Sequence, residues 1–600
     1  MSAASRLPWP QLRAHIPSCA LILILGILIY GNHLHAPFQF DSVHYVQDRQ
    51  ELQYQENRIT FDFFIREYKS RSLMTMTIAW NSILGKSNPY GYHLFNLTFH
   101  LFNSLLLFFI TGNAGRRFQL YRMSVTGKEI QALSLFAAFL FMIHPLQTES
   151  VIDIMGRSEV LAATFYLGGF LLFQNALDGK SAPLVRYTVI PLAILVLAIL
   201  GFGVKQTLIT LPAVMMLYYL CGCAPESLPI RTLKKGKWFF ILIAGAGFSL
   251  LLRKLLSDET FLIGPAPVEK MAGRKIYMLT QPPVLMFYYL KLILFPVNLS
   301  IDPDILLVDQ WLSPRFLSAF LLITFAMYLA VVAKRSRIWF FFVGWFFIII
   351  SPSSSIITLQ DLAAEHRVYL ASYGVYLLLA LGLLLMLFED RAECIMRGNS
   401  RPNARLLGYI ALIVITLLLC GITIKRNAVW NSELTLWDDA RKKAPAKVRP
   451  LANLARAYSL GDDNDRAMAL YEQSIARNSS LFESHYNLGD LYYKSGRVED
   501  GLNHILIAAA LEPRIAEIQA RLGEIYMDRK QYELADAHFR NALELNSQYV
   551  IALHNLAVVN YYYLKDKKHE ALLYFARSLE LDPNQKDARL IRRLLEQQNQ

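Results

Sequence analysis

The sequence predicts an all-α protein in two parts, a polytopic membrane bundle followed by a helical-repeat solenoid. Eleven apolar segments with roughly the length of a bilayer-crossing helix occupy the chain up to residue 425. Beyond that residue the apolar segments stop, and a repeat with a period of 34 residues begins. The chain is 54% hydrophobic although its last part is polar and charged, as expected when a membrane domain precedes a soluble one. We therefore predict a membrane domain at residues 1–425 and a repeat domain at residues 426–600.

The apolar segments differ in length. A helix needs roughly 20 apolar residues to cross the hydrocarbon core, so the shorter segments indicate tilted helices or helices buried within the bundle. The first segment lacks a small-residue cleavage site and is predicted to be a retained anchor. The predicted spans lie near residues 14–31, 91–111, 131–145, 150–176, 186–203, 207–222, 238–252, 315–333, 338–351, 368–388 and 406–424.

Basic residues in the connections predict the orientation of the bundle. Clusters such as Arg116–Arg117 and Lys334–Arg335 follow the even-numbered spans. Lys and Arg concentrate in cytoplasmic loops, so a cytoplasmic N-terminus puts every cluster inside if the apolar piece Val284–Asn298 does not cross. We predict that this piece is a partial or interfacial helix and that the repeats are extracytoplasmic. The net charge of +13 then reflects loop composition, and no nucleic-acid partner is predicted.

The C-terminal part carries the tetratricopeptide pattern. The triplet that begins at Asn453 recurs in phase at positions 487, 521 and 555, and an aromatic residue follows each copy. This period is typical of a helix–turn–helix unit whose stacked copies share one core. We expect the aromatic side chains to pack in that core and the concave groove to hold an extended peptide.

The stretch Phe38–Val43 follows the first span directly and begins a long loop on the predicted outer face. It contains one acid, Asp41. Spacing alone leaves two interpretations open. The carboxylate can cap a helix or pair with an arginine, as loop aspartates usually do. Alternatively, it can take the proton from an acceptor hydroxyl at the membrane surface.

A second polar group runs from His144 through Glu149 to Arg157. If the predicted span 150–176 is one continuous helix, Arg157 lies about 10 Å along it from Ser150. Charges at that depth face a bundle interior or a wet cavity and often mark functional sites. The alternative is local helix chemistry, in which Ser150 caps the helix and Arg157 pairs with an acid one turn earlier.

Two further positions carry charge beside apolar segments. Lys205 lies in a tight turn, where its ammonium group can reach the interface or meet an anionic headgroup. Glu365, His366 and Arg367 precede the tenth span. They can form a self-contained ion-pair cluster, yet arginine is also the side chain that grips phosphate best, through two parallel hydrogen bonds.

Several other function classes lack their sequence signatures. No phosphate-binding glycine loop, zinc-protease helix or serine-hydrolase elbow stands in a suitable context. The five cysteines lie in the predicted spans or beside them, so neither a disulfide framework nor a zinc site is predicted.

Many short segments, ordered along almost the whole chain, carry a family resemblance. They are Phe40-Asp41, Tyr92–Asn96, His144-Pro145, Thr148-Glu149, Gly156–Glu159, Lys205, Ile209–Pro212, Leu279–Pro282, Phe295–Ser300, Ser354–Ile356, Leu359–Asp361, Ala364–Leu370, Arg426-Asn427, Trp430 and Glu433–Trp437. Together with the repeats, they resemble the transmembrane and tetratricopeptide-repeat-containing (TMTC) O-mannosyltransferases and their bacterial relatives. The resemblance implies the GT-C glycosyltransferase architecture, in which a polytopic bundle uses a polyprenyl- or dolichyl-phosphate-linked sugar at an extracytoplasmic active site.

The resemblance also implies a mechanism. Asp41 matches the family's first-loop acid and would act as base on an acceptor hydroxyl, which displaces lipid phosphate from the anomeric carbon with inversion. Arg367, with Lys205 or Arg157, would stabilise the leaving phosphate. Glu149 would orient the acceptor or the sugar.

Other residues of the matching segments are expected to contact the substrate, namely His93, His144, Glu365 and His366. Relatives often carry a second acid after the first, where this chain has Ser42. This departure favours catalysis by a single acid without a metal, so no metal site is predicted. The lipid-phosphate-linked sugar is the expected donor.

The expected acceptor is a protein or peptide that the repeats present, either outside a bacterial inner membrane or at the endoplasmic reticulum membrane of a eukaryote. Two alternatives stay open. The chain can be a non-catalytic membrane-anchored scaffold for envelope or glycan assembly, or a GT-C transferase with a lipid or polysaccharide acceptor. A mere anchor has no reason to make Arg157, Lys205 and Glu365–Arg367 converge on one pocket at the level of the membrane.

Overall fold

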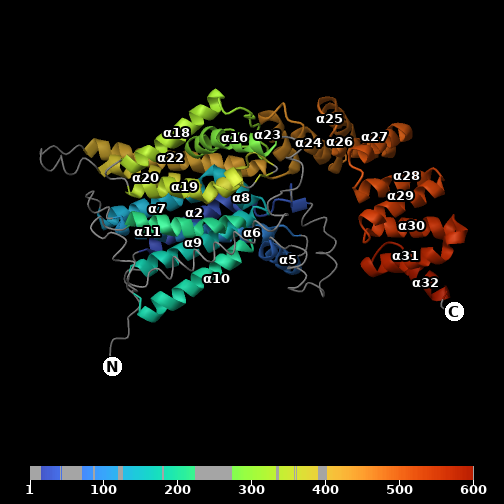
Figure 1. Cartoon of the computed structure of the whole chain (residues 1–600), viewed down its shortest axis with the longest axis horizontal. Helices are drawn as coiled ribbons and strands as arrows, with labels where there is room; N and C mark the ends of the chain where they lie inside the picture. The colour runs from blue at the N-terminus through green and yellow to red at the C-terminus, as the bar shows by residue number, and fades with distance from the viewer. Residues whose placement is uncertain are drawn as a thin grey trace. The chain divides into compact units, whose positions relative to one another are not determined.

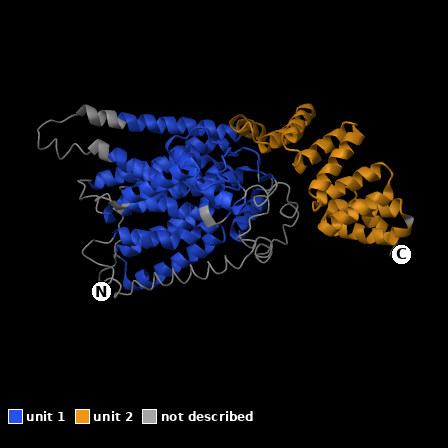
Figure 2. Cartoon of the chain, turned by 45° about the horizontal axis from the view of Figure 1, so that its top comes forward, with its two compact units in different colours: residues 1–432 blue, residues 433–600 orange. Residues whose placement is uncertain are grey.

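The computed structural model describes residues 15–40, 42–43, 71–85, 88–118, 126–178, 181–222, 273–332, 337–356, 358–359, 361–388 and 402–598. Every regular element in these ranges is a helix, which confirms the predicted all-α class. The chain forms two compact units, Met1–Ser432 and Glu433–Gln600 (Figure 2). The predicted division after residue 425 falls within the last helix of the first unit, α22 (Pro402–Val429).

The first unit is a bundle of helices, most of them long and apolar. They are α2 (Ile16–Tyr30), α5 (Ser72–Gly85), α6 (Tyr90–Arg117), α7 (Gly127–Ile143), α8 (Thr148–Ile152), α9 (Arg157–Leu177), α10 (Ile190–Phe202), α11 (Leu211–Gly222), α16 (Arg274–Pro283), α17 (Leu290–Leu294), α18 (Pro314–Val332), α19 (Arg337–Ile350), α20 (Ser372–Phe388) and α22. The short 3-10 helices η4 (Pro145–Gln147), η6 (Gln206–Thr210) and η10 (Glu365–Val368) lie between them, and the π-helical stretch η8 (Val284–Tyr289) continues α16 directly into α17. In Figure 1 long helices such as α2, α7, α9 and α10 lie with their axes roughly aligned.

Helix α6 lies at the centre of the bundle, against α2, α5, α7, α8 and α9. Of its apolar stretch 61% is buried, whereas only 11% of the stretch Val185–Phe202, which contains α10, is buried. Lipid tails are as apolar as leucine, so an exposed apolar helix surface is stable inside a bilayer. We therefore assign α6 to the core of the bundle and α10 to its lipid-facing rim.

The lengths of the helices support a polytopic membrane bundle. Among the described residues, five helices are long and apolar enough to cross a membrane, and α7 with Pro145–Ile152, a pair bent by 51°, counts as a sixth if the two form one span. Four shorter apolar helices accompany them. The predicted bundle is confirmed, while the number of eleven spans and the assignment of Val284–Asn298 as a piece that does not cross the membrane stay predictions. The predicted span at 238–252 lies outside the described residues.

The predicted span at 150–176 is wrong as a single helix. The chain leaves the helical path after α8 and resumes it at Arg157, where α9 begins. Gly156 lies in this break, and a Cβ atom there would stand 2.5 Å from the carbonyl oxygen of Ser150. Glycine avoids this clash because it lacks a Cβ atom. Ser150 is an inner residue of α8 rather than a cap, and Arg157 occupies the first turn of a new helix.

The second unit is the predicted solenoid. After α23 (Glu433–Lys443), consecutive helices pair as α24–α25, α26–α27, α28–α29 and α30–α31, and α32 (Ala588–Gln598) packs on the last pair. The pairs are α24 (Arg449–Leu460) with α25 (Asn464–Arg477), α26 (Phe482–Lys494) with α27 (Val498–Leu511), α28 (Ala516–Asp528) with α29 (Tyr532–Leu545), and α30 (Val550–Tyr562) with α31 (Lys568–Leu581).

The aromatic residues of the repeats pack in the core, as predicted. Tyr492 is buried, and Tyr458, Tyr526 and Tyr561 pack, partly buried, against clusters of core residues. Each repeat therefore uses its aromatic residue to bury surface against its neighbours, which is how stacked repeats obtain a continuous core.

Candidate functional site

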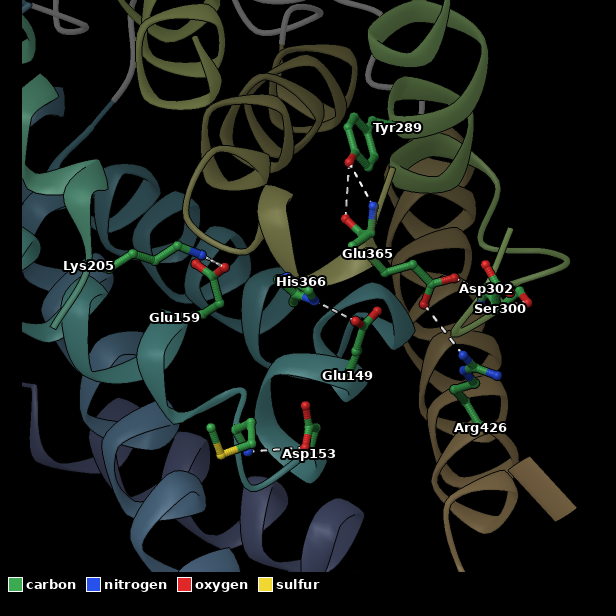
Figure 3. A network of polar contacts seen from close by, with 12 residues as sticks. Glu149, Asp153, Glu159, Lys205, Tyr289, Ser300, Asp302, Glu365, His366 and Arg426 are labelled. Carbon is green, nitrogen blue, oxygen red and sulfur yellow. Dashed lines mark hydrogen bonds and ion pairs between the residues drawn. The ribbon is translucent and has the colours of Figure 1, made fainter. Parts of the chain in front are cut away.

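Helix η10 is the centre of a polar network in the membrane unit (Figure 3). The residue before it, Ala364, is buried and has an extended backbone. The hydroxyl of Tyr289, from η8, donates to the carbonyl oxygen of Ala364 and accepts from its amide, each at 3.1 Å. Because one side chain satisfies both backbone groups, the position of the following turn is well defined. Three chemically active side chains project from that turn.

Glu365 is fully buried, and two of its contacts reach distant segments. Its Oε1 accepts from the amide of Ser300 at 2.5 Å, and its Oε2 lies 3.6 Å from Nη2 of Arg426, near the end of α22. A buried charge is strongly unfavourable alone, whereas a partner and a hydrogen bond offset much of the desolvation penalty. The hydrogen bond with Ser300 therefore joins η10 to the segment after α17, and the ion pair with Arg426 joins η10 to the last helix of the unit.

His366 points the other way, toward Glu149 of α8. Its Nδ1 lies 2.5 Å from Oε1 of Glu149. The Glu149 side chain is only 3% exposed, whereas that of His366 is 35% exposed. A carboxylate accepts hydrogen bonds but does not donate them, so Nδ1 carries the proton. The exposed side of the ring then presents Nε2.

Arg367 brings a positive charge to the same turn. Its guanidinium group lies near Tyr277 of α16. Its Nη1 is buried and has no hydrogen-bond partner within the part of the chain that is described. A buried N–H without an acceptor costs about 1–3 kcal/mol, and more when the group is charged. An anion bound beside Nη1 would supply the acceptor.

Lys205 lies between α10 and η6 and forms an ion pair with Glu159 of α9. Burial, together with the positive charges of Arg71 and Arg367, lowers the pKa of Lys205, and the carboxylate of Glu149 opposes this effect. These couplings show that Lys205 shares one electrostatic environment with Arg367 and Glu149. The structure thus brings together residues that are far apart in the sequence.

Arg157 is held by protein groups. It is fully buried, and its three guanidinium nitrogens donate to Asn96 Oδ1 at 3.2 Å, Thr77 Oγ1 at 3.4 Å and the Tyr92 carbonyl oxygen at 3.2 Å. The ring of Phe95 lies 4.1 Å from its central carbon. The side chain therefore ties α9 to α5 and α6, and this geometry favours a structural role.

His93 and His144 are also buried and bonded to the backbone. Nε2 of His93 lies 3.0 Å from the carbonyl oxygen of Ala36, and Nε2 of His144 lies 3.1 Å from that of Ile293. Nδ1 of His144 accepts from the amide of Leu146. Both rings brace connections between helices, and contact of either ring with a substrate stays a prediction.

Asp41 lies outside the described residues, but both of its flanks are described. The Ser42 hydroxyl donates to the Gln39 carbonyl oxygen at 2.6 Å and accepts from the Gln39 amide at 2.8 Å. The Gln39 side-chain amide donates to the carbonyl oxygen of Trp430, just after α22. Phe40 has a positive φ of 52°, which is uncommon for a bulky residue. The described residues on either side of Asp41 are therefore hydrogen-bonded to each other and to the backbone just after α22.

Sequence reasoning assigned no role to several members of the network. Arg426 stands in a matching segment, and a charge at the end of an apolar helix is itself a signal of function or pairing. Ser300, Tyr277 and Tyr289 act through a backbone amide and hydroxyl groups, so their residue types carried no signal. Among the described residues, no group of three His, Cys, Asp or Glu side chains is placed to hold a metal ion.

Comparisons with known proteins agree with both parts of the chain. Models of the tetratricopeptide repeat match residues 451–480 and 516–549. The human protein O-mannosyl-transferase TMTC3 is 24% identical over 96% of this chain and 65% of its own length. Drosophila melanogaster Tmtc3 is 23% identical over 89% of this chain and 64% of its own length. Human TMTC1 is 25% identical over 86% of this chain and 58% of its own length. A crystal structure of MamA matches 25% of this chain and 86% of its own, with 18% identity and a TM-score of 0.23.

The predicted resemblance to the TMTC O-mannosyltransferases is thereby confirmed over most of the chain. The chain spans about two thirds of the length of the TMTC3 relatives that it matches.

Proposed function

We propose that this chain is a membrane glycosyltransferase that moves a sugar from a lipid-phosphate donor to a hydroxyl group of a protein on the extracytoplasmic face. Its relatives are named protein O-mannosyl-transferases, which supports mannose as the sugar and a protein as the acceptor. The apolar bundle supplies access to a lipid donor, and the repeats supply a surface for a protein partner.

The clustering of charged side chains around η10 supports the proposal independently of the names of the relatives. Glu149, Lys205 and Arg367 come from three separate segments and meet around η10, with the Glu365–Arg426 pair on its other side. Placing charges inside an apolar bundle costs several kcal/mol for each charge, so a scaffold gains nothing from them. Convergence of this kind is typical of a site that binds a charged ligand.

The proposed mechanism follows from this arrangement. Asp41 takes the proton of the acceptor hydroxyl, whose oxygen attacks the anomeric carbon in line and displaces lipid phosphate with inversion. Arg367 and Lys205 stabilise the charge that develops on the leaving phosphate, since fixed cations act most strongly where water is excluded. Glu149 holds the geometry between the sugar and these cations. Arg157, which the sequence offered as an alternative to Lys205, is already occupied by protein groups.

The test uses the full chain purified into lipid vesicles. Synthetic polyprenyl-phosphate mannose and a mixture of serine- and threonine-containing peptides are added, and the products are read by mass spectrometry. We expect peptides that gain one hexose, with no product from a nucleotide-linked sugar. Products formed only from the nucleotide sugar would refute the lipid donor, and hexose found only on an added lipid acceptor would refute the protein acceptor.

Removal of the repeats separates donor chemistry from acceptor presentation. A chain that ends at Ser432 keeps the whole first compact unit. We expect it to stay folded and to bind donor, while transfer to whole proteins falls by roughly 10²-fold, because tethering raises the effective concentration of a partner by about that factor or more. Undiminished modification of whole proteins would contradict acceptor presentation by the repeats.

The matched control is a chain that ends at Arg426. It lacks Asn427, whose side-chain amide donates to the Ile29 carbonyl oxygen at 2.9 Å, and Trp430, which is 1% exposed. Loss of a buried tryptophan typically costs about 3–5 kcal/mol. We therefore expect a lower melting temperature of the bundle in this shorter chain than in the chain that ends at Ser432.

A further inference from the structure

The environment of His366 is suited to a general acid, in addition to the substrate contact that the sequence predicts. Its Nδ1 is fixed by Glu149 at 2.5 Å, while the ring keeps an exposed edge. A carboxylate that holds one nitrogen of an imidazole sets the tautomer and stabilises the imidazolium ion, as it does in hydrolase triads. Proton transfer can then take place only at Nε2.

The neighbours of His366 indicate what that nitrogen faces. Arg367 follows it in the chain and has a buried Nη1 that lacks an acceptor within the described residues. Lys205 is coupled electrostatically to both Arg367 and Glu149. The Glu365 carboxylate points away, toward Ser300 and Arg426. The surroundings therefore favour an anion beside the ring, which fits the phosphate of a donor better than a neutral hydroxyl.

We propose that His366, positioned by Glu149, is the general acid that protonates the leaving lipid phosphate. This inference rests on the proposed function, and it adds a catalytic residue and a positioning residue to that reaction. Asp41 remains the base at the acceptor, so the two proton transfers take place at opposite ends of the reacting centre.

The step balances as follows. The acceptor oxygen forms a bond to the anomeric carbon, and its proton goes to the base. The bond from the anomeric carbon to the phosphate oxygen breaks, and its electron pair stays on that oxygen. His366 enters the step as the imidazolium ion, and its Nε2 proton passes to the released phosphate. Asp41 then releases the acceptor's proton to solvent, and the ring takes one up from solvent, so no net charge is left behind.

The experiment varies the leaving group. His366→Gln retains a hydrogen-bonding amide but has no acidic proton to give. With polyprenyl-phosphate sugar, we expect its turnover to fall by about 10²–10⁴-fold. A difluoromethylphosphonate donor, in which CF2 replaces the oxygen between phosphorus and the polyprenyl chain, releases a weaker base and needs less protonation, so the defect of His366→Gln should be smaller with it. Glu149→Gln should show the same dependence on the leaving group with a smaller defect.

His569→Gln, an exposed histidine in the repeats, is the matched control and should behave as the unmodified chain does. Unchanged melting temperature and donor affinity establish that each variant is folded. An equal defect with both donors, or turnover of His366→Gln within a few-fold of the unmodified chain, would overturn the acid assignment. Failure of the unmodified chain to use either donor would instead refute the proposed function itself.

Discussion

Replacement of Asp41 by asparagine is expected to lower turnover by about 10²–10⁴-fold while donor affinity changes little. Asparagine keeps the shape of the side chain but cannot take a proton from the acceptor hydroxyl. The residues on either side of Asp41 are linked by the Ser42–Gln39 hydrogen bonds and by the contact of Gln39 with Trp430. These contacts are made by the flanking residues, so the exchange is expected to leave them in place.

A comparison with Arg367→Ala sharpens this prediction. The donor is already anionic before reaction, so loss of a phosphate contact weakens donor binding as well as turnover. Binding and turnover are scored separately, on purified protein in lipid with a synthetic polyprenyl-phosphate sugar. Asp304→Asn, which alters an exposed loop carboxylate, is the control. If Asp41→Asn turns over within a few-fold of the unmodified chain, Asp41 is only a capping residue and Glu149 becomes the next base to test.

Replacement of Arg157 by alanine is expected to lower the free energy of unfolding of the bundle by about 1–3 kcal/mol for each buried acceptor that loses its donor. Removal of the guanidinium group leaves Asn96 Oδ1 and the Tyr92 carbonyl oxygen without this donor and opens a gap beside Phe95. The effect is read as a lower melting temperature and a lower yield of folded protein in detergent.

Two variants define the cause of this effect. Arg157→Lys keeps the charge but loses the planar fork that reaches three partners, so we expect an intermediate melting temperature. Arg315→Ala, at an exposed arginine near the start of α18, should change stability by no more than about 0.5 kcal/mol. If Arg157→Ala has an unchanged melting temperature but a weakened donor affinity, the structural role is contradicted and Arg157 is a phosphate contact.

The break between α8 and α9 shows why the sequence pattern wrongly predicted residues 150–176 as one continuous helix. The segment 150–176 is apolar enough to read as one helix, and helix propensity alone does not interrupt it. The interruption depends on Gly156, which packs directly on the Ser150 carbonyl oxygen. A contact between backbone atoms leaves no hydrophobic period in the sequence. The same limit applies to α5, a helix within a long loop that the sequence did not predict.

The sequence by itself determined the all-α class of the protein and its division into a membrane domain and a repeat domain. Apolar length is a direct physical requirement of a bilayer, and a 34-residue period is a direct consequence of stacking one unit on the next. The residue types of the site were also available from sequence, since Glu149, Lys205 and Arg367 are charges beside apolar segments.

Only the tertiary structure decided how these residues are paired. Glu149 meets His366 across 217 positions of the chain, and Glu365 meets Arg426, to which the sequence assigned no role. The tertiary structure also shows that the guanidinium group of Arg157 donates to Asn96, Thr77 and Tyr92. The physical reason is that a buried charge must find its partners in three dimensions, and helix packing, not sequence spacing, places those partners within reach.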